Sequence, residues 1–237
     1  MKTLVLLPVP LDNWPEFYQY IKRFCDTWRK FPPDDDSMEL IALCCKADPT
    51  DTVKDVFYHL PVRYFRYDGD GADLGAHQWF AHHIKGEAFL WTMTSRMYFH
   101  RAGWGRRMRD VRERNESLRL FGLSASHEGG KLHLCTRGHA MYASDLRRYP
   151  TMITSRDQGV FFELGDGCLL DWARVEGLAP VLVFWNAVAT EKDWFNYANT
   201  FRNGSQENMI AWDKHSDAYA SADDAEKARL TRLMLGE

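Results

Sequence analysis

The chain has 237 residues, of which 45% are apolar and 14% aromatic, enough for one domain with a substantial core and incompatible with global disorder. Its formal net charge of −3 excludes a globally basic nucleic-acid-binding protein. The five cysteines include an adjacent pair in an apolar run and fit neither a disulfide framework nor a zinc site, so we expect reduced thiols.

The N-terminal sequence MKTLVLLPVP has one lysine and an apolar run that ends at Pro8, which is too short for a signal peptide. No segment approaches the roughly 20 apolar residues that a membrane span needs. We therefore expect a soluble protein of the cytoplasm, the compartment in which thiols stay reduced.

The first 95 residues alternate between short apolar runs, typical of buried strands, and amphipathic helices. Strands are expected at residues 3–9, 38–47, 61–67 and 87–93. The helices between them are expected to start at Asp12 or Asn13, at about residue 50, and after the Gly/Asp-rich loop that follows residue 66. This order predicts a mostly parallel sheet covered by helices, with crossovers of one hand.

Ligands of such sheets bind where the parallel strands end. The expected strand ends place four segments on one rim: residues 8–13, 46–50, 67–75 and 92–96. A binding site is therefore expected at this edge of the sheet.

The second part of the chain predicts smaller elements. We expect a basic helix at 103–118, two strands joined by a Gly-Gly turn within 120–141, a helical turn near 145–150, a helical region at 155–178 interrupted at its GDG sequence, and a strand at 179–185. The last 52 residues are polar and aromatic and end in a solvated helix. The fold class is thus α/β, with residues 1–185 as one domain and residues 186–237 as a helical or irregular extension packed on it.

The segment RYDGDGADLGAHQWFAHH, residues 66–83, combines three aspartates and three glycines with a following helix. Counted from Asp68, its residues do not match the ligand positions of an EF-hand, which excludes calcium binding of that type. Two interpretations stay open. The glycines form a phosphate-binding loop in which a divalent ion offsets the aspartates, or the loop is a tight turn with Asp68 or Asp73 as the helix N-cap.

Three motifs, taken with the order of the elements, resemble nucleotide-sugar glycosyltransferases of the GT-A fold. LVLLPVPLDN resembles their first strand and nucleotide-binding loop, and YDGDGADLGAHQWFAHH resembles the turn and helix under their donor. SRDQGVFFELGDGCLLDWARVEGLAPVLVF resembles their late segment, in which an acidic residue heads a helix before another strand. The resemblance covers residues 3 to about 185 and implies a GT-A-like three-layer α/β/α catalytic domain.

The resemblance implies a function and a set of site residues. The chain is expected to transfer a sugar from a nucleotide-sugar donor to a hydroxyl acceptor, with Asp157 as the base that deprotonates the acceptor. The alternative for Asp157 is that it caps its helix. The expected donor-binding residues are Pro8, Pro10, Asp12, Asp68, Asp70, Asp73, Thr94 and Arg96.

The sequence departs from the family after the fourth strand, where the acidic D-x-D metal motif is replaced by TMTSRMYFH. One interpretation is a displaced metal site for Mn²⁺ or Mg²⁺ formed by Asp68 and Asp70, with His215 as a late ligand. The other is a metal-independent reaction in which Arg96, His100 or Arg101 neutralises the leaving diphosphate. A surface position is the alternative for His215.

Two further segments supply candidate binding residues. We interpret the expected hairpin as a wall of the site; it contains His127, Glu128, Lys131, His133, Arg137 and His139. The expected acceptor- or phosphate-binding residues are His127, Glu128 and Arg137 from this hairpin, together with Arg101. Eight arginines between Arg96 and Arg119, with no lysine among them, suit phosphate contacts or a solvated helix face.

The acceptor is open between a glycan, a lipid-linked sugar, a protein and a hydroxylated nucleobase, the last as a DNA modification of the phage type, to which the arginine cluster would contribute. A nucleotidyltransferase is disfavoured because PVPLDN contains no glycine. The alternative from another class is a non-catalytic sugar- or nucleic-acid-binding protein on a transferase-like fold.

Overall fold

The computed structural model describes residues 1–115 and 117–237. Its main sheet has eight strands in the order β10-β9-β5-β8-β4-β1-β2-β3. Pairing is parallel from β3 through β2 and β1 to β4 and between β5 and β9, whereas β8 is antiparallel to β4 and β5, and β10 to β9. The expected α/β class with a mostly parallel sheet is therefore confirmed.

The first half of the chain alternates strands and helices as expected. The strands are β1 (Thr3–Pro10), β2 (Met38–Cys45), β3 (Val62–Tyr67) and β4 (Phe89–Met93). The helices are α1 (Trp14–Lys30), α2 (Asp51–Val56), α3 (Ala72–His83) and α4 (Trp104–Arg114). The basic helix expected at 103–118 ends at Arg114, and the expected range includes residue 116, which lies outside the described residues.

The second half contains more, shorter elements than expected. These are β5 (Leu120–Gly122), β6 (Ala125–Ser126), β7 (His133–Leu134), β8 (Gly138–Tyr142), α5 (Ala143–Arg148), α6 (Arg156–Leu164), α7 (Leu169–Val175), β9 (Val181–Val183), β10 (Val188–Thr190), a 3₁₀ turn (Glu191–Asp193), α8 (Lys214–Ser221) and α9 (Asp224–Leu235). The expected interruption at GDG separates α6 from α7, and the solvated C-terminal helix is α9.

The predicted two-stranded hairpin at 120–141 is wrong in detail, because each strand is split in two. β5 and β8 belong to the main sheet, while β6 and β7 form a separate two-stranded sheet. The expected Gly-Gly turn joins β6 to β7, with positive φ at Gly129 and Gly130. The change of sheet occurs beside Gly122 and Gly138, where an added Cβ would lie 2.5 Å from Leu134 and 2.7 Å from Leu123.

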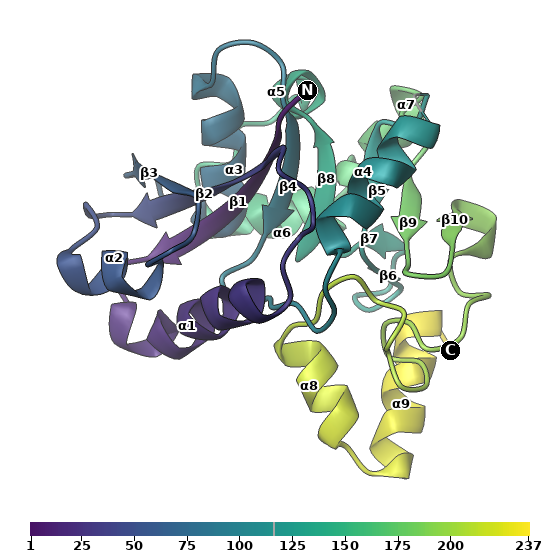
Figure 1. Ribbon diagram of the computed structural model, residues 1–237. Helices are drawn as coiled ribbons and strands as arrows, with labels where there is room; N and C mark the ends of the chain where they lie inside the picture. The colour runs from purple at the N-terminus through teal and green to yellow at the C-terminus, as the bar shows by residue number, and fades with distance from the viewer. Residues whose placement is uncertain (116) are drawn as a thin grey trace.

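Helices cover both faces of the main sheet, which gives three layers (Figure 1). Successive residues of β1 point to opposite faces: Leu4 and Leu6 belong to one buried cluster, and Val5 and Leu7 to the other. The first cluster packs under α3, α5, α6 and α7, and the second under α1, α2 and α4. The continuous apolar run of β1 therefore results from burial on both faces.

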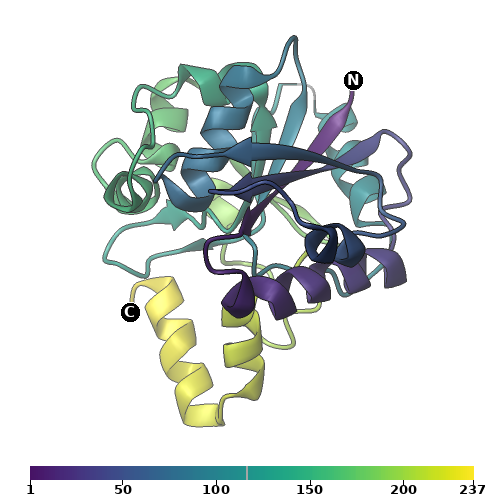
Figure 2. The ribbon, with the colours of Figure 1, turned by 90° about the vertical axis from the view of Figure 1, so that its left-hand side faces the viewer.

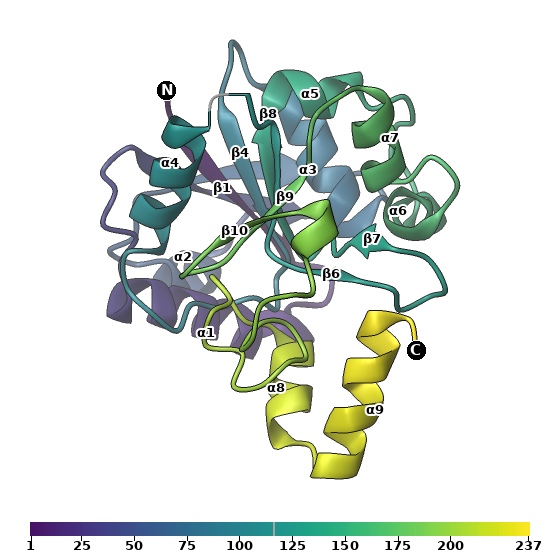
Figure 3. The same cartoon turned by 90° about the vertical axis from the view of Figure 1, so that its right-hand side faces the viewer.

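After β10 the chain crosses an irregular segment and ends in α8 and α9, which lie side by side and project away from the sheet (Figures 1 and 2). Figure 3 shows the same two helices from the side opposite to that of Figure 2, with β6 near the C-terminus. Backbone bonds join Tyr98 to Trp212 in both directions, at 2.8 and 2.9 Å. Every helix in the described part of the chain is too short or too polar to cross a bilayer.

Candidate active-site cleft

A cleft of about 700 Å³ opens where β1, β2, β3 and β4 end. All four segments expected on the rim contribute to it, as do α1, α6 and the chain before β8. Its lining residues are Pro10, Asp12, Asn13, Glu16, Phe17, Cys45, Lys46, Tyr67, Gly69, Asp70, Gly71, Ala72, Asp73, Leu74, Thr94, Arg96, Thr136, Arg137, Arg156, Gly159, Val160 and Glu163. The cleft therefore lies at the edge of the sheet where the sequence predicts the binding site.

The first turn of α1 forms one wall of the cleft and holds Arg96. Arg96 donates a hydrogen bond of 3.0 Å to Glu16, and its guanidinium lies 4.4 Å from the centre of the Phe17 ring. A guanidinium against an aromatic face is stabilised by the charge distribution of the ring. Arg96 is thus a cation held in place in the segment after β4, where the sequence analysis looked for an acidic D-x-D motif.

The three glycines of the Gly/Asp-rich loop are required by close packing. A Cβ at Gly69 would lie 2.4 Å from the hydroxyl oxygen of Tyr67, and a Cβ at Gly75 would lie 2.5 Å from the same oxygen. At Gly71 it would lie 2.2 Å from the carbonyl oxygen of Ile153. The loop therefore wraps the Tyr67 ring and lets the chain before α6 approach α3, an explanation independent of phosphate binding.

The carboxylates of the same loop have basic partners. Asp68 lies 2.9 Å from the Arg66 guanidinium, and Lys46 forms an ion pair with Asp70. Lys46 also donates a hydrogen bond of 2.8 Å to the Asp68 carbonyl. The N-cap of α3 is Gly71, so the interpretation of an aspartate as N-cap is wrong. Asp70 lines the cleft, and Asp68 does not.

Asp73 is the cleft carboxylate with the most perturbed environment. It is half-buried in the first turn of α3, next to Ala72, whose φ of 48° is rare for a residue other than glycine. Burial raises the pKa of Asp73 to about 6, although the Ser95 amide and the nearby Arg96 act in the opposite direction. A carboxylate kept in such a place is a candidate functional group.

One face of α6 forms the opposite wall. Arg156, Gly159, Val160 and Glu163 follow helical spacing and all line the cleft. Glu163 accepts a hydrogen bond of 3.0 Å from the Thr136 amide, which fixes its side chain beside the chain that leads into β8.

The expected base, Asp157, is exposed in the first turn of α6 and does not line the cleft. The cap of this helix is Ser155, whose hydroxyl accepts from the Gln158 amide at 3.3 Å, so the interpretation of Asp157 as the cap is wrong. Glu163, on the same helix, has a carboxylate that lines the cleft, and the sequence analysis did not single it out.

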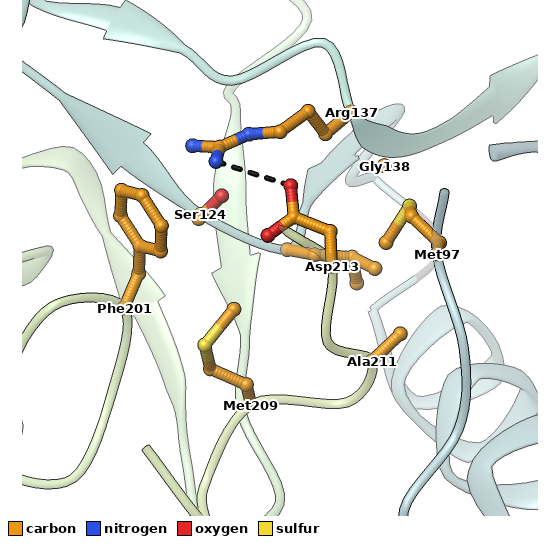
Figure 4. A pocket seen from close by; sticks show the side chains of 9 residues that line it. Met97, Ser124, Arg137, Gly138, Phe201, Met209, Ala211 and Asp213 are labelled. Carbon is orange, nitrogen blue, oxygen red and sulfur yellow. Dashed lines mark hydrogen bonds and ion pairs between the residues drawn. The ribbon is translucent and has the colours of Figure 1, made fainter. Parts of the chain in front are cut away.

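Arg137 lies at the boundary between the cleft and a second, much smaller pocket, whose lining Figure 4 shows. Its guanidinium donates a hydrogen bond of 3.2 Å to Asp213, from the C-terminal segment. Although burial acts against it, Arg137, His215 and the backbone amides of Ser216 and His215 lower the pKa of Asp213. The pair is therefore an ionised salt bridge between the buried Asp213 and the partly buried Arg137.

The remaining expected site residues do not line the cleft. Pro8 is buried within β1, and Arg101 stacks on Trp185 with its guanidinium 4.5 Å from the ring centre. His127 contacts the Phe195 ring, and Glu128 lies 2.8 Å from Arg202. His215 is half-buried in the first turn of α8.

The arginine cluster is largely engaged in contacts within the chain. Seven of the eight arginines meet a carboxylate, a backbone carbonyl, a hydroxyl or an aromatic ring: Arg96 with Glu16, Arg101 with Trp185, Arg106 with Asp34, Arg107 with the Phe184 and Ala187 carbonyls, Arg109 with Asp35, Arg112 with Thr3, and Arg119 with Asp145. Most of these arginines are therefore held by partners within the chain and form neither a solvated helix face nor a set of unpaired cations.

The residues present do not form a ready metal site. Among residues 1–115 and 117–237 no group of three or more His, Cys, Asp or Glu side chains is arranged to hold a metal ion. The three expected ligands, Asp68, Asp70 and His215, belong to the β3–α3 loop and to α8. The four residues after β4 are Thr94, Ser95, Arg96 and Met97, which bring no carboxylate.

All five cysteines are buried free thiols, as expected. Cys45 lines the cleft, and burial raises its pKa to about 12, so it is a neutral apolar surface of the floor. Two buried histidines, His77 on α3 and His139 on β8, are also kept neutral, because burial lowers their pKa values to about 3 and about 4.

No protein-family model matches the sequence, and no curated protein does either. Similar solved structures include S. aureus TarS 1–349, with 13% identity, a TM-score of 0.37 and coverage of 52% of this chain and 35% of that one. The galactosyltransferase LgtC in complex with donor and acceptor sugar analogues gives 11% identity, a TM-score of 0.43 and coverage of 61% and 59%. The mannosyltransferase PcManGT from Pyrobaculum calidifontis, in complex with GDP-Man and Mn²⁺, gives 10% identity, a TM-score of 0.39 and coverage of 59% and 44%.

The chain thus spans less than two thirds of the length of each of these three structures. Two of the three are named as glycosyltransferases, LgtC and PcManGT. All three TM-scores are below 0.5, so we base the functional argument on the cleft alone.

Proposed function

We propose that the protein transfers a sugar from a nucleotide-sugar donor to a hydroxyl group of an acceptor in the cleft at the ends of β1–β4. The observation that carries the proposal is the composition of this cleft, which combines carboxylates with arginines in one space of about 700 Å³. This volume is within the range of small-molecule sites. Glycosyl transfer needs both kinds of group: a base for the acceptor and cations for the departing diphosphate.

The two walls suggest how the substrates are arranged. The loops after β1, β2 and β3, with Pro10, Asp12 and Lys46, face the nucleoside of the donor. The guanidinium groups of Arg96 and Arg156 face its phosphates from opposite sides. In the reaction the bond between the sugar and the diphosphate breaks, the acceptor oxygen bonds to the sugar carbon, and the acceptor proton passes to a carboxylate.

Glu163 is our first candidate for that carboxylate, since it lines the cleft and the Thr136 amide orients it. Asp157 stays a prediction from the sequence, and it is not among the residues that line the cleft. Exchange of each carboxylate for its amide separates the two: we expect loss of transfer for Glu163→Gln and near-normal transfer for Asp157→Asn.

We derive no step through a divalent metal, because no group of three or more His, Cys, Asp or Glu side chains in the described part of the chain is arranged to hold one. Diphosphate stabilisation by arginine alone is chemically sufficient. Turnover measured with Mn²⁺, with Mg²⁺ and with a chelator decides between this mechanism and the metal-dependent one that the sequence also suggested.

For the acceptor we favour a soluble or lipid-linked glycan over DNA. The arginines between Arg96 and Arg119, which suggested nucleic acid, are mostly held by partners within the chain. Binding to duplex DNA at low salt tests this choice: an affinity in the micromolar range that weakens steeply with salt would return DNA to the list of acceptors.

A non-catalytic binding protein is the second candidate, favoured by the sequence Thr94-Ser95-Arg96 in place of an acidic motif. The experiment that separates it from an enzyme is hydrolysis of UDP-, GDP- and CMP-sugars, with and without Mn²⁺. Release of sugar by the wild-type protein that Glu163→Gln abolishes supports the enzyme. Tight binding of a nucleotide sugar with no turnover under any condition supports the binding protein.

A further inference from the structure

Arg137 connects the cleft to the C-terminal segment, residues 186–237. It precedes β8, and its own carbonyl accepts a hydrogen bond of 3.1 Å from the Thr94 amide at the floor of the cleft. On its other side the small pocket that it lines is closed by Phe201, Met209 and Asp213, all from the C-terminal segment (Figure 4). The position of Arg137 therefore depends on both parts of the chain.

Two side chains of the C-terminal segment hold the guanidinium. Asp213 accepts its hydrogen bond of 3.2 Å, and the Phe201 ring centre lies 4.3 Å away. Asp213 is itself fixed as the N-cap of α8, because its Oδ1 accepts the amides of His215 and Ser216 at 3.0 Å each. Arg137 is thus aimed by a carboxylate that has little freedom to move.

Stability alone is a weak reason for such an arrangement. Taking two charges out of water costs much of what their attraction returns, and apolar replacements of buried pairs are often as stable. The pair also uses only part of the donors available: a guanidinium has five N–H groups, of which one meets Asp213 and another the Cys135 sulfur. Glu163, the other carboxylate in the surroundings of Arg137, lines the cleft, whereas Asp213 does not.

We propose that Arg137 contacts the diphosphate of the nucleotide-sugar donor and that Asp213 is the positioning residue that holds it there. The C-terminal segment is then part of the donor site, although it lines the cleft with none of its own side chains. This inference rests on the proposed function, since it requires a ligand with phosphate groups in the cleft.

The test compares charged and uncharged probes. Binding of UDP, GDP, CDP and ADP is measured by calorimetry beside binding of the matching nucleosides. We expect Arg137→Gln to weaken the best diphosphate by about 10- to 100-fold, the range for a hydrogen bond between charged groups, and to leave the matching nucleoside unchanged. Equal weakening of both, or of neither, would overturn the role of Arg137.

Asp213→Asn tests the positioning role of Asp213, because positioning and competition predict opposite changes in diphosphate affinity. Asn keeps the ability to cap α8 but removes the charge that aims Arg137, so positioning predicts weaker diphosphate binding by several-fold. If Asp213 only competes with phosphate for the guanidinium, its neutralisation strengthens diphosphate binding instead. Stronger or unchanged binding would therefore overturn the proposal.

Two controls exclude a general effect on folding. Asp223→Ala removes the side-chain N-cap of α9, which bonds the Glu226 amide and not Asp213, and should leave diphosphate binding unchanged. In the Arg137→Gln background, Asp213→Asn should cause no further loss, because a positioning residue acts only through its partner. If no diphosphate binds the wild-type protein, the proposed function fails together with this inference; if one binds and Arg137→Gln has no effect, only this inference fails.

Discussion

Asp73→Asn should stabilise the protein at neutral pH. Burial raises the pKa of Asp73 from 3.8 to about 6, so ionising it in the folded state costs about 3 kcal/mol, taking about 1.4 kcal/mol for each pKa unit. Asn has the same shape and still accepts the hydrogen bond of the Ser95 amide, but it carries no charge. This loss of folding free energy is consistent with Asp73 serving a function in the cleft rather than stabilising the fold.

The sign of the pH dependence follows from the direction of this shift. The folded protein keeps the Asp73 proton to a higher pH than the unfolded chain, so the contribution to stability is fully present below about pH 3.8 and is lost as the pH rises through about 6. We expect the free energies of unfolding of wild type and Asp73→Asn to agree near pH 4 and to differ by about 2–3 kcal/mol at pH 7.5.

The assay is urea-induced unfolding of both proteins at pH 4, 5, 6 and 7.5, with comparable m-values as the condition for interpretation. His77 and His139, whose pKa values are lowered, have the opposite effect: they make the folded protein less stable as the pH falls below about 6.5. They are present in both proteins, so their effect cancels in the difference between wild type and variant.

Asp70→Asn, at an exposed side chain, is the matched control and should change the free energy of unfolding by less than about 0.5 kcal/mol. A difference that does not vary with pH, or a less stable Asp73→Asn at pH 7.5, would refute the reasoning.

The other predictions concern packing and catalysis. Gly75→Ala should cost about 1–3 kcal/mol, because its Cβ would lie 2.5 Å from Tyr67 and 2.6 Å from the Ile153 carbonyl. Gly159→Ala should instead stabilise the protein by up to about 1 kcal/mol, because Gly159 is also helical and its added Cβ would meet its nearest neighbour, Leu74, at 3.7 Å. If thermal unfolding ranks the two variants the other way, the packing of α3 against the chain before α6 is contradicted. Glu163→Gln should lower kcat for sugar transfer by about 10²- to 10⁴-fold with little change in donor KM, whereas the reverse pattern in steady-state kinetics would assign Glu163 to donor binding.

Much of the first half of the fold could be predicted from the sequence, because β1 to β4 are continuous apolar runs and the helices between them are amphipathic. The edge of the sheet that carries the cleft followed from this order. The second half was less predictable: β5 to β8 are two to five residues long, and the transfer of the hairpin from one sheet to another depends on packing at Gly122 and Gly138.

The site residues divide in the same way. Those at or shortly after the ends of strands, such as Pro10, Asp12, Asp70, Thr94 and Arg96, line the cleft as their position in the sequence suggested. Glu163 and Arg156 did not stand out, although the spacing of residues 156, 159, 160 and 163 marks one helix face. The partnership of Arg137 with Asp213 joins residues 76 positions apart and depends on tertiary structure alone.

The most direct test of the central claim is calorimetric titration of the wild-type protein with UDP-, GDP- and CMP-sugars, repeated with Arg96→Gln and Arg137→Gln. We predict that one class of nucleotide sugar binds with a Kd in the micromolar range, and that each substitution weakens it about tenfold or more through loss of a charged hydrogen bond. If no nucleotide sugar binds at millimolar concentration, or if binding is indifferent to both arginines, the cleft is not a donor site.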